Sequence, residues 1–379
     1  RMLHTIVQIG AMSVTMPSGR TFQYGDGTGK PVHVTIHDTG TMRRLMANPE
    51  LAAGESYMNS GLTIEDDDLF RFLEIIVQNM GAGKHTWWQV WLGHLRNALR
   101  IARQYNPMDV ARRNVAHHYD LSGQLYDLFL DTDKQYSCGY FRHPDDTLEQ
   151  AQAQKKAHIA GKLLLERDMR VLDIGCGWGG MALTLAQDYG ARVLGVTLSE
   201  EQHRIATARA EAAGLSDRVE FRLADYRKVD ERFDRIVSVG MFEHVGVPQY
   251  GKYFAQVHDK LTDDGVALIH TIGRSNPPGH TNPWIAKYIF PGGYIPSMSE
   301  VLKVTEKHDL WVTDIEVWRL HYAETLRHWH ARFMANRDRV AALYDERFCR
   351  MWRFYLQAAE VTFRHDHQCV FQFQLARRQ

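Results

Sequence analysis

The sequence contains few cysteines, no net charge and no long apolar run. The four cysteines lie far apart, with no CxxC pair and no cysteine and histidine cluster at the spacing of a zinc site. We therefore expect reduced thiols, as in a cytoplasmic protein, and no bound metal. Lysine plus arginine and aspartate plus glutamate number 45 each, so no global positive field attracts nucleic acid or an anionic membrane. No stretch approaches the roughly 18 apolar residues that span a bilayer.

The amino-terminal residues, 1–105, have the pattern of a smaller α+β domain. Residues 32–36 alternate between apolar and polar side chains, which predicts a half-buried strand. Residues 69–77 carry apolar side chains at the i, i+3, i+4 spacing of a helix. The tryptophan-rich stretch 87–99 predicts a helix that either lies on a lipid surface or packs against the next domain. Pro107 then disfavours helix at the preceding residue and marks a linker.

Residues 108–379 have the pattern of one α/β domain. Short apolar runs alternate with segments of helical composition, which predicts a parallel, doubly wound, Rossmann-like sheet of about seven strands with ligands at the carboxyl ends of the strands. The aromatic segment 322–364 is too long for one crossover and predicts an inserted helical cover. The proline-rich segment 276–296 predicts a long irregular loop, which in a compact domain is usually functional. The expected strands span 170–174, 192–197, 219–223, 235–239, 266–272, 312–317 and 370–375.

One apolar run ends in Asp173 and opens into a turn that contains Gly175, Gly177 and Gly179. Glycines let the backbone approach a ligand where a Cβ atom would collide. The glycine spacing alone also fits a dinucleotide site. An acid directly before the glycines would repel a pyrophosphate, whereas it can bind the α-ammonium group of an amino acid. The segment therefore favours S-adenosylmethionine over NAD, with these four residues as cofactor contacts.

Three further residues stand where a nucleoside needs partners. Asp225 ends an apolar run and is placed to accept a hydrogen bond from the adenine amine, with a helix N-cap as the alternative. Thr197 ends the second expected strand and Gln202 follows it, at the place where most adenosylmethionine enzymes have an acid for the ribose hydroxyls. We expect ribose contacts from these two residues, which differ from the usual acid.

Six motifs occur in order from about residue 108 to the end of the chain. Together they resemble the cyclopropane-fatty-acyl-phospholipid synthases, which are related to the mycolic acid cyclopropane synthases. The resemblance is more specific than a generic methyltransferase signature and implies a class I methyltransferase domain. Besides the glycine turn, the motifs are His118-Tyr119-Asp120-Leu121, Tyr136-Ser137-Cys138-Gly139-Tyr140-Phe141, Gly195-Val196-Thr197-Leu198-Ser199, Glu243-His244-Val245-Gly246 and Tyr288-Ile289-Phe290-Pro291-Gly292-Gly293.

The resemblance implies a bound bicarbonate ion as the catalytic base. Cysteine, histidine and tyrosine side chains can donate hydrogen bonds to its oxygens, and an ionised glutamate can accept one from its hydroxyl group. Each implied ligand also has a structural alternative, such as a small buried cysteine, a surface acid or a core histidine. The implied ligands are Cys138, Glu243, His270 and Tyr322, with the backbone at Ile272, and the implied further cofactor contacts are Tyr136 and Ser137.

The resemblance also implies a substrate and a setting. The amino-terminal domain looks like the lipid-binding domain of the phospholipid-acting members, which favours cis-unsaturated acyl chains of membrane phospholipids as substrate. A homodimer is implied, located in the cytoplasm and peripherally associated with the inner face of the membrane. Methyl transfer to an alkene leaves a carbocation, which requires a water-free, aromatic-lined site. Candidate aromatic residues, for which core packing is the alternative role, are Phe290, Tyr294, Trp318 and Trp329.

Three other activities compete with ring closure. Proton loss from a neighbouring carbon would give an exomethylene chain, which reduction would turn into a methyl-branched one. A non-catalytic binder of lipid or adenosylmethionine would need no base site, so the implied ligands count against it. A nucleic-acid methyltransferase is disfavoured by the zero net charge and because Asn276-Pro277-Pro278 is followed by Gly279 instead of the tyrosine of an Asn-Pro-Pro-Tyr motif.

Overall fold

The computed structural model describes residues 7–80 and 123–378. The predicted helix at 87–99, the predicted linker before residue 108 and the motif at 118–121 lie outside these residues. The chain forms two compact units, and each is described separately. The first unit consists of Arg1–Arg100, His280–Phe290 and Leu326–His367, and the second consists of Ile101–Gly279, Pro291–Thr325 and Gln368–Gln379.

This grouping differs from a single division of the chain near residue 105. Residues 326–367, which include most of the segment 322–364 predicted as a helical cover of the carboxyl-terminal domain, group with the amino-terminal residues. The cause is that α16 (Glu346–His365) packs against α3 (Pro49–Met58) and α4 (Leu69–Met80). The functional limits of the two domains, 1–105 and 108–379, stay a prediction.

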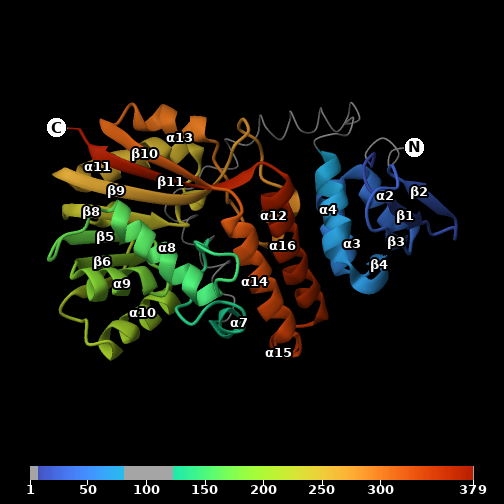
Figure 1. The fold of residues 1–379 in the computed structure, drawn as a ribbon, viewed down its shortest axis with the longest axis horizontal. Helices are drawn as coiled ribbons and strands as arrows, with labels where there is room; N and C mark the ends of the chain where they lie inside the picture. The colour runs from blue at the N-terminus through green and yellow to red at the C-terminus, as the bar shows by residue number, and fades with distance from the viewer. Residues whose placement is uncertain (1–6, 81–122, 379) are drawn as a thin grey trace. The chain divides into compact units, whose positions relative to one another are not determined.

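The first unit contains a four-stranded sheet with the strand order β2-β1-β3-β4 (Figure 1). β3 is the strand predicted at residues 32–36, and alternate side chains along it are buried, as expected for period two. The acidic run before α4 forms a short turn of 3₁₀ helix, η1 (Glu65–Asp67). The strands are β1 (Met12–Thr15), β2 (Thr21–Tyr24), β3 (Val32–Ile36) and β4 (Leu62–Ile64). The other helices are α2 (Thr39–Ala47), α12 (Pro283–Tyr288), α15 (Arg337–Leu343) and the carboxyl-terminal part of α14 (His321–Ala335).

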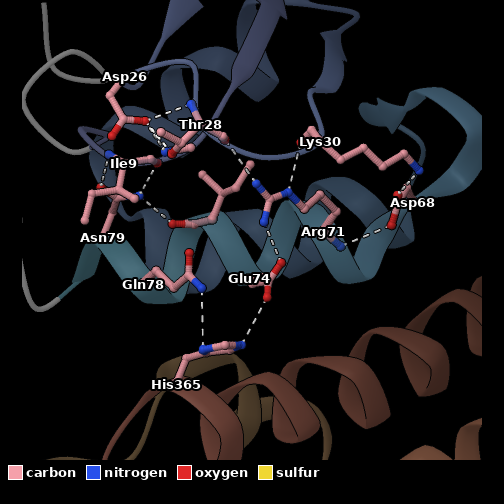
Figure 2. Close-up of polar contacts among 12 residues, drawn as sticks. Ile9, Asp26, Thr28, Lys30, Asp68, Arg71, Glu74, Gln78, Asn79 and His365 are labelled. Carbon is pink, nitrogen blue, oxygen red and sulfur yellow. Dashed lines mark hydrogen bonds and ion pairs between the residues drawn. The ribbon is translucent and has the colours of Figure 1, made fainter.

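Polar contacts tie α4 to distant segments of the first unit (Figure 2). Arg71 donates to Glu74 at 2.7 Å and to the carbonyl of Lys30 at 3.0 Å. His365, the last residue of α16, lies 3.1 Å from the other oxygen of Glu74. Asn79 Oδ1 accepts hydrogen bonds from two backbone N–H groups that precede β1. These contacts join the start of the chain, α4 and α16 within one unit.

The second unit is built on a seven-stranded sheet with the order β10-β11-β9-β8-β5-β6-β7 (Figure 1). The pairs among β5 to β9 are parallel, which confirms the predicted α/β, doubly wound class I methyltransferase fold. β11 runs antiparallel to both of its neighbours, β9 and β10. The strands are β5 (Arg170–Ile174), β6 (Arg192–Thr197), β7 (Val219–Leu223), β8 (Phe233–Val239), β9 (Leu261–Arg274), β10 (Leu310–Trp318) and β11 (Gln368–Arg377). The helices are α7 (Gly123–Asp127), α8 (Leu148–Lys162), α9 (Gly180–Tyr189), α10 (Glu200–Ala212), α11 (Tyr250–Lys260) and α13 (Met298–Thr305).

Apolar side chains cover both faces of the seven-stranded sheet. The adjacent residues Val171 and Leu172 of β5 belong to different buried clusters, and so do Ile236 and Val237 of β8. A strand that is buried on both faces has a continuous apolar sequence. The apolar runs of the sequence therefore coincide with the strands, and three of them, β5, β6 and β7, have the predicted ends.

Helix α3 of the first unit packs closely on α12 through a glycine. A Cβ atom at Gly54 would lie 2.6 Å from Cδ1 of the Trp284 indole. Trp284 is buried, and its ring centroid lies 4.8 Å from that of Phe354 in α16. The indole thus fills the space between three helices, and any side chain at Gly54 would displace it.

We expect Gly54→Ala to lower the free energy of unfolding by about 1–3 kcal/mol, because the added methyl group overpacks this site. Gly161→Ala is the matched control, since Gly161 lies in α8 and a Cβ there would meet no atom within 4 Å. The control should gain about 0.5–1 kcal/mol from the higher helix propensity of alanine. Urea unfolding followed by tryptophan fluorescence measures both variants. Equal stability of the two variants would contradict the packing argument.

Candidate active site

The glycine turn connects β5 to α9 in left-handed backbone conformations. Gly175, Gly177 and Gly179 have φ angles of 81°, 54° and 86°, which residues with a side chain rarely adopt. A Cβ at Gly179 would lie 2.6 Å from Cζ of Phe221, whereas a Cβ at Gly177 would meet no atom within 4 Å. Packing therefore requires a glycine at position 179, and the turn leaves room beside Gly177, a predicted cofactor contact.

Asp173 lies at the carboxyl end of β5 and is buried. Its Oδ2 has no hydrogen-bond partner among the described residues. Burial raises the pKa of this carboxyl group to about 7, although the positive charge of Lys155 acts in the opposite direction. A buried carboxylate without a donor is costly, and an ammonium group would supply both donors and the opposite charge. The residue therefore fits the α-ammonium group of S-adenosylmethionine.

The two predicted ribose contacts lie together. Thr197 Oγ1 donates to Gln202 Oε1 at 2.8 Å, and both side chains are buried. Thr197 is the last residue of β6, and Gln202 lies in the first turn of α10, which Ser199 caps. Because β6 runs parallel to β5, its carboxyl end lies at the same edge of the sheet as the glycine turn.

Asp225 follows β7 and caps η2 (Tyr226–Lys228), a turn of 3₁₀ helix. Its Oδ1 accepts from the backbone N–H of Arg227 at 3.0 Å, and its Oδ2 lies 2.5 Å from the Arg227 guanidinium. The structure thus shows the capping role that was the alternative for this residue. A carboxylate has further lone pairs, so the contact with adenine stays a prediction.

The segment before α8 carries the predicted cofactor contacts Tyr136 and Ser137. Lys155 of α8 donates to Ser137 Oγ and to Gln135 Oε1, each at 2.7 Å. The Tyr136 ring packs against Tyr126 with centroids 5.3 Å apart. Lys155 is fully buried, which lowers the pKa of its ammonium group to about 8. Sequence analysis missed this residue, because one of two adjacent lysines in a helix has the pattern of a solvated face.

Glu243 lies in η3 (Phe242–His244), shortly after β8. Its Oε1 accepts from the backbone N–H of Ile272 in β9 at 2.7 Å. Its Oε2 is buried and has no hydrogen-bond partner among the described residues. Burial raises the pKa of the carboxyl group to about 7. Glu243 is thus a buried acid with one fixed and one available oxygen, and the Ile272 N–H contacts it directly.

His270 lies four residues before the end of β9, with 2% of its surface exposed. Its Nδ1 is 3.1 Å from Nε2 of Gln372 in β11. Burial, assisted by the positive charge of Lys155, lowers the pKa of the imidazole to about 3. The ring is therefore neutral, with one donor and one acceptor nitrogen. Sequence analysis also missed Gln372, whose only signal is a polar position within a predicted buried strand.

A hydrogen bond joins the segment that follows Cys138 to α14, the helix that carries Tyr322. The backbone N–H of Gly139 donates to Thr325 Oγ1 at 2.9 Å, and Thr325 lies one helical turn after Tyr322. Both Cys138 and Tyr322 are buried. Burial raises the pKa of the Cys138 thiol, so this group remains protonated and can donate a hydrogen bond. The fold thus joins the segment that carries Cys138 to the helix that carries Tyr322.

Trp318, the last residue of β10, packs against His270 and against residues close in the chain to Cys138 and Tyr322. Its ring centroid lies 5.1 Å from that of His270. It also lies 4.8 Å from Tyr140, which closely follows Cys138, and 5.4 Å from His321, which begins α14. Trp318 is therefore a common neighbour of His270 and of the segments that carry Cys138 and Tyr322. Their arrangement around a bound ion stays a prediction.

All four cysteines are buried free thiols. Among the described residues, no group of three or more histidine, cysteine, aspartate or glutamate side chains is placed to hold a metal ion. Within residues 7–80 and 123–378, no helix has both the length and the apolar character needed to cross a membrane.

Two models of known protein families match this chain, one over residues 107–373 and one over residues 2–84. The family model described as mycolic acid cyclopropane synthetase matches residues 107–373. The chain belongs to this family. A model for a domain of unknown function, DUF7884, matches residues 2–84. Membership of the mycolic acid cyclopropane synthetase family makes the protein an S-adenosylmethionine-dependent methyltransferase.

Similar individual proteins agree with this family. The cyclopropane-fatty-acyl-phospholipid synthase of Escherichia coli K12 is 39% identical over 340 residues, which cover 88% of this chain and 85% of that protein. The tuberculostearic acid methyltransferase UfaA1 of Mycobacterium tuberculosis is 36% identical over 93% of this chain and 87% of its own. The crystal structure of the mycolic acid cyclopropane synthase CmaA1 with SAH and CTAB has a TM-score of 0.67 and 35% identity, covering 72% of this chain and 100% of that one.

We expect the affinity for S-adenosylmethionine to fall as the pH drops below about 7, because Asp173 then becomes protonated and loses its attraction for the ammonium group. Asp173→Asn should weaken binding roughly 10-fold or more at pH 8 and abolish this pH dependence. Asp188→Asn makes the same change at an exposed acid of α9 and should behave as the unmodified protein. Isothermal titration calorimetry at several pH values measures the dissociation constants. If the Asp173→Asn variant binds S-adenosylmethionine with the same pH dependence as the unmodified protein, Asp173 is not the residue that binds the ammonium group.

Proposed function

We propose that this protein transfers the methyl group of S-adenosylmethionine to the cis double bond of an unsaturated acyl chain in a membrane phospholipid and then closes a cyclopropane ring. The named activities of the similar proteins support methylation of lipid chains. The alignment with the cyclopropane-fatty-acyl-phospholipid synthase of Escherichia coli covers 88% of this chain, whereas the alignment with the mycolic acid cyclopropane synthase CmaA1 covers 72% of it. The longer alignment supports phospholipid as the substrate.

One observation carries the proposal of a base that removes a proton after methyl transfer. Glu243 is a buried carboxyl group with its Oε1 fixed by the Ile272 N–H and its Oε2 without a partner among the described residues. A buried acceptor of this kind is costly unless a donor reaches it. The hydroxyl group of a bicarbonate ion is such a donor, and methyl transfer alone would not need it.

The first step depends on positioning and on exclusion of water. S-adenosylmethionine supplies an electrophilic methyl group, and its transfer to the alkene gives S-adenosylhomocysteine and a carbocation on the acyl chain. Asp173 holds the ammonium end of the cofactor and so fixes the position of the methyl group. The buried rings of Trp318 and Tyr294 keep water from the cation, and aromatic ring faces add a modest stabilisation. Tyr294 is tied to the site because its N–H donates to the Glu243 carbonyl at 2.9 Å.

The second step removes a proton from the transferred methyl group and closes the ring. Bicarbonate, when bound, supplies the base for this proton. Glu243, once ionised, accepts from the hydroxyl group of the ion, and the Cys138 thiol, the Tyr322 phenol and the neutral His270 ring donate to its oxygens. Two further predicted aromatic residues, Phe290 and Trp329, belong to the first unit, and their role in the reaction stays a prediction.

A second product is supported by one of the relatives. UfaA1, which matches 93% of this chain, is named a tuberculostearic acid methyltransferase. The same carbocation that loses a proton from a neighbouring carbon gives an exomethylene chain, and its reduction gives a methyl branch. Both products require a base, so the Glu243 site is compatible with either. We propose the cyclopropane product because of the similarity to the cyclopropane-fatty-acyl-phospholipid synthase of Escherichia coli.

The proposal includes a setting for the enzyme. A phospholipid substrate requires contact with a membrane, so we propose peripheral association with the inner face of the cytoplasmic membrane. We also propose a homodimer, as the family resemblance implies. The amino-terminal unit, for which no activity follows from its matched domain family, is the proposed lipid-binding part.

The activity is tested with the purified protein, radiolabelled methyl donor and phospholipid vesicles that carry cis-monounsaturated chains. We expect label in the lipid, and none with vesicles of saturated phospholipid, because only the alkene offers π-electrons to the methyl group. Gas chromatography with mass spectrometry of the released chains then separates a cyclopropane from an exomethylene product. If the unsaturated lipid carries no label after the reaction, the proposed function is refuted.

We expect Glu243→Gln to lower the turnover rate at saturating S-adenosylmethionine by roughly 100-fold or more, because an amide cannot replace the carboxylate as acceptor. Cofactor binding should be unchanged. In the unmodified enzyme the rate should fall below about pH 7, where Glu243 is protonated. Glu211→Gln, at an exposed position of α10, is the matched control. A fully active Glu243→Gln enzyme would take Glu243 out of the base site.

A further inference from the structure

Three side chains form a row across the end of the sheet that carries the candidate base site. Gln372 of β11 pairs directly with His270 of β9 on one side and with Glu316 of β10 on the other. Cross-strand partners lie on the same face of a sheet with their Cβ atoms about 5 Å apart. The row therefore places the amide of Gln372 between an acid and the imidazole.

Glu316 is already engaged with helix α8. It lies 2.6 Å from His158 Nε2 and 2.5 Å from Lys162 Nζ. The Gln372 amide turns instead to the imidazole, and its Nε2 donates to His270 Nδ1 at 3.1 Å. Gln372 is completely buried, and its Oε1 has no hydrogen-bond partner among the described residues.

A glutamine at position 372 lowers the stability of the fold. Its side chain is completely buried, and a buried polar atom without a partner costs stability. An apolar side chain of similar size would avoid this cost. The hydrogen bond to His270 is the described contact that a glutamine makes and an apolar residue cannot make. The Gln372 amide therefore costs the core stability but makes a hydrogen bond to His270.

The direction of this hydrogen bond decides where the proton of His270 lies. A neutral imidazole has one N–H donor and one acceptor nitrogen. Because Nδ1 accepts from Gln372, the proton is on Nε2. The opposite tautomer would place a lone pair at Nε2, which repels an anion.

We propose that Gln372 is a positioning residue that holds His270 in its Nε2-protonated tautomer, so that the imidazole offers an N–H donor to the anion of the base site. The proposal deepens the proposed function and rests on it for the identity of the anion. Gln372 itself acts through His270 and touches neither substrate nor cofactor in this scheme.

Nitrogen NMR of the full-length protein, labelled in its histidine rings, measures the tautomer directly. The His270 signal is identified by its loss in His270→Gln. We expect a protonated Nε2 in the unmodified protein and a mixture of tautomers in Gln372→Leu, which removes the donor and keeps the volume. A protonated Nδ1 in the unmodified protein, or an unchanged tautomer in Gln372→Leu, overturns the proposal. This measurement does not depend on activity.

Kinetics with added bicarbonate provide the second arm. Gln372→Leu should raise the half-saturating bicarbonate concentration roughly 3- to 15-fold, the effect of losing one hydrogen bond, with the affinity for S-adenosylmethionine unchanged. Gln374→Leu is the matched control, because Gln374 lies two residues further along the same strand and bonds to the carbonyl of Lys162 and to Thr313. Equal bicarbonate dependence in the two variants overturns the proposal. An unmodified enzyme without bicarbonate dependence refutes the proposed base, while the NMR arm still decides the tautomer.

Discussion

The pairing of β9 with β8 on one side and β11 on the other determines the candidate base site. β8 and β9 are parallel, so their carboxyl ends meet at one edge, and Glu243, which follows β8, reaches the N–H of Ile272 in β9. β11 is antiparallel to β9 and sets Gln372 beside His270. A shift of this register by one residue would turn each side chain to the other face of the sheet. The hydrogen bonds between these strands, which build the core, thus also position the side chains of the candidate base site.

Burial gives the site its electrostatic character. It raises the pKa values of Asp173 and Glu243 to about 7 and lowers that of His270 to about 3. A carboxyl group whose pKa is raised in the folded state destabilises the fold as the pH rises from its unfolded pKa, near 4.5 or below, towards 7. A ligand that binds the folded state and supplies a donor or an opposite charge recovers this stability. Cofactor and ion binding are therefore coupled to the stability of the unit that holds them.

The architecture of the second unit was predictable because its strands are buried on both faces and have continuous apolar sequences. The glycine turn was predictable because its backbone angles exclude other residues. The antiparallel direction of β11 was not, since a buried strand has the same apolar pattern in either direction. Nor was the grouping of residues 326–367 with the amino-terminal unit, because an amphipathic helix such as α16 does not specify what covers its apolar face.

The sequence by itself determined the cofactor class and the family, because these depend on residue types in a local order. The family resemblance adds Cys138, Glu243, His270 and Tyr322 as base-site residues, and their role stays a prediction. Only the tertiary structure decided which oxygens are left without partners, which pKa values shift and which residues support the site. Lys155 and Gln372 show the reason. Both are polar residues in amphipathic or alternating segments, and their burial and hydrogen bonds depend on contacts with distant parts of the chain. Sequence gives the chemical groups, whereas packing sets their protonation and direction.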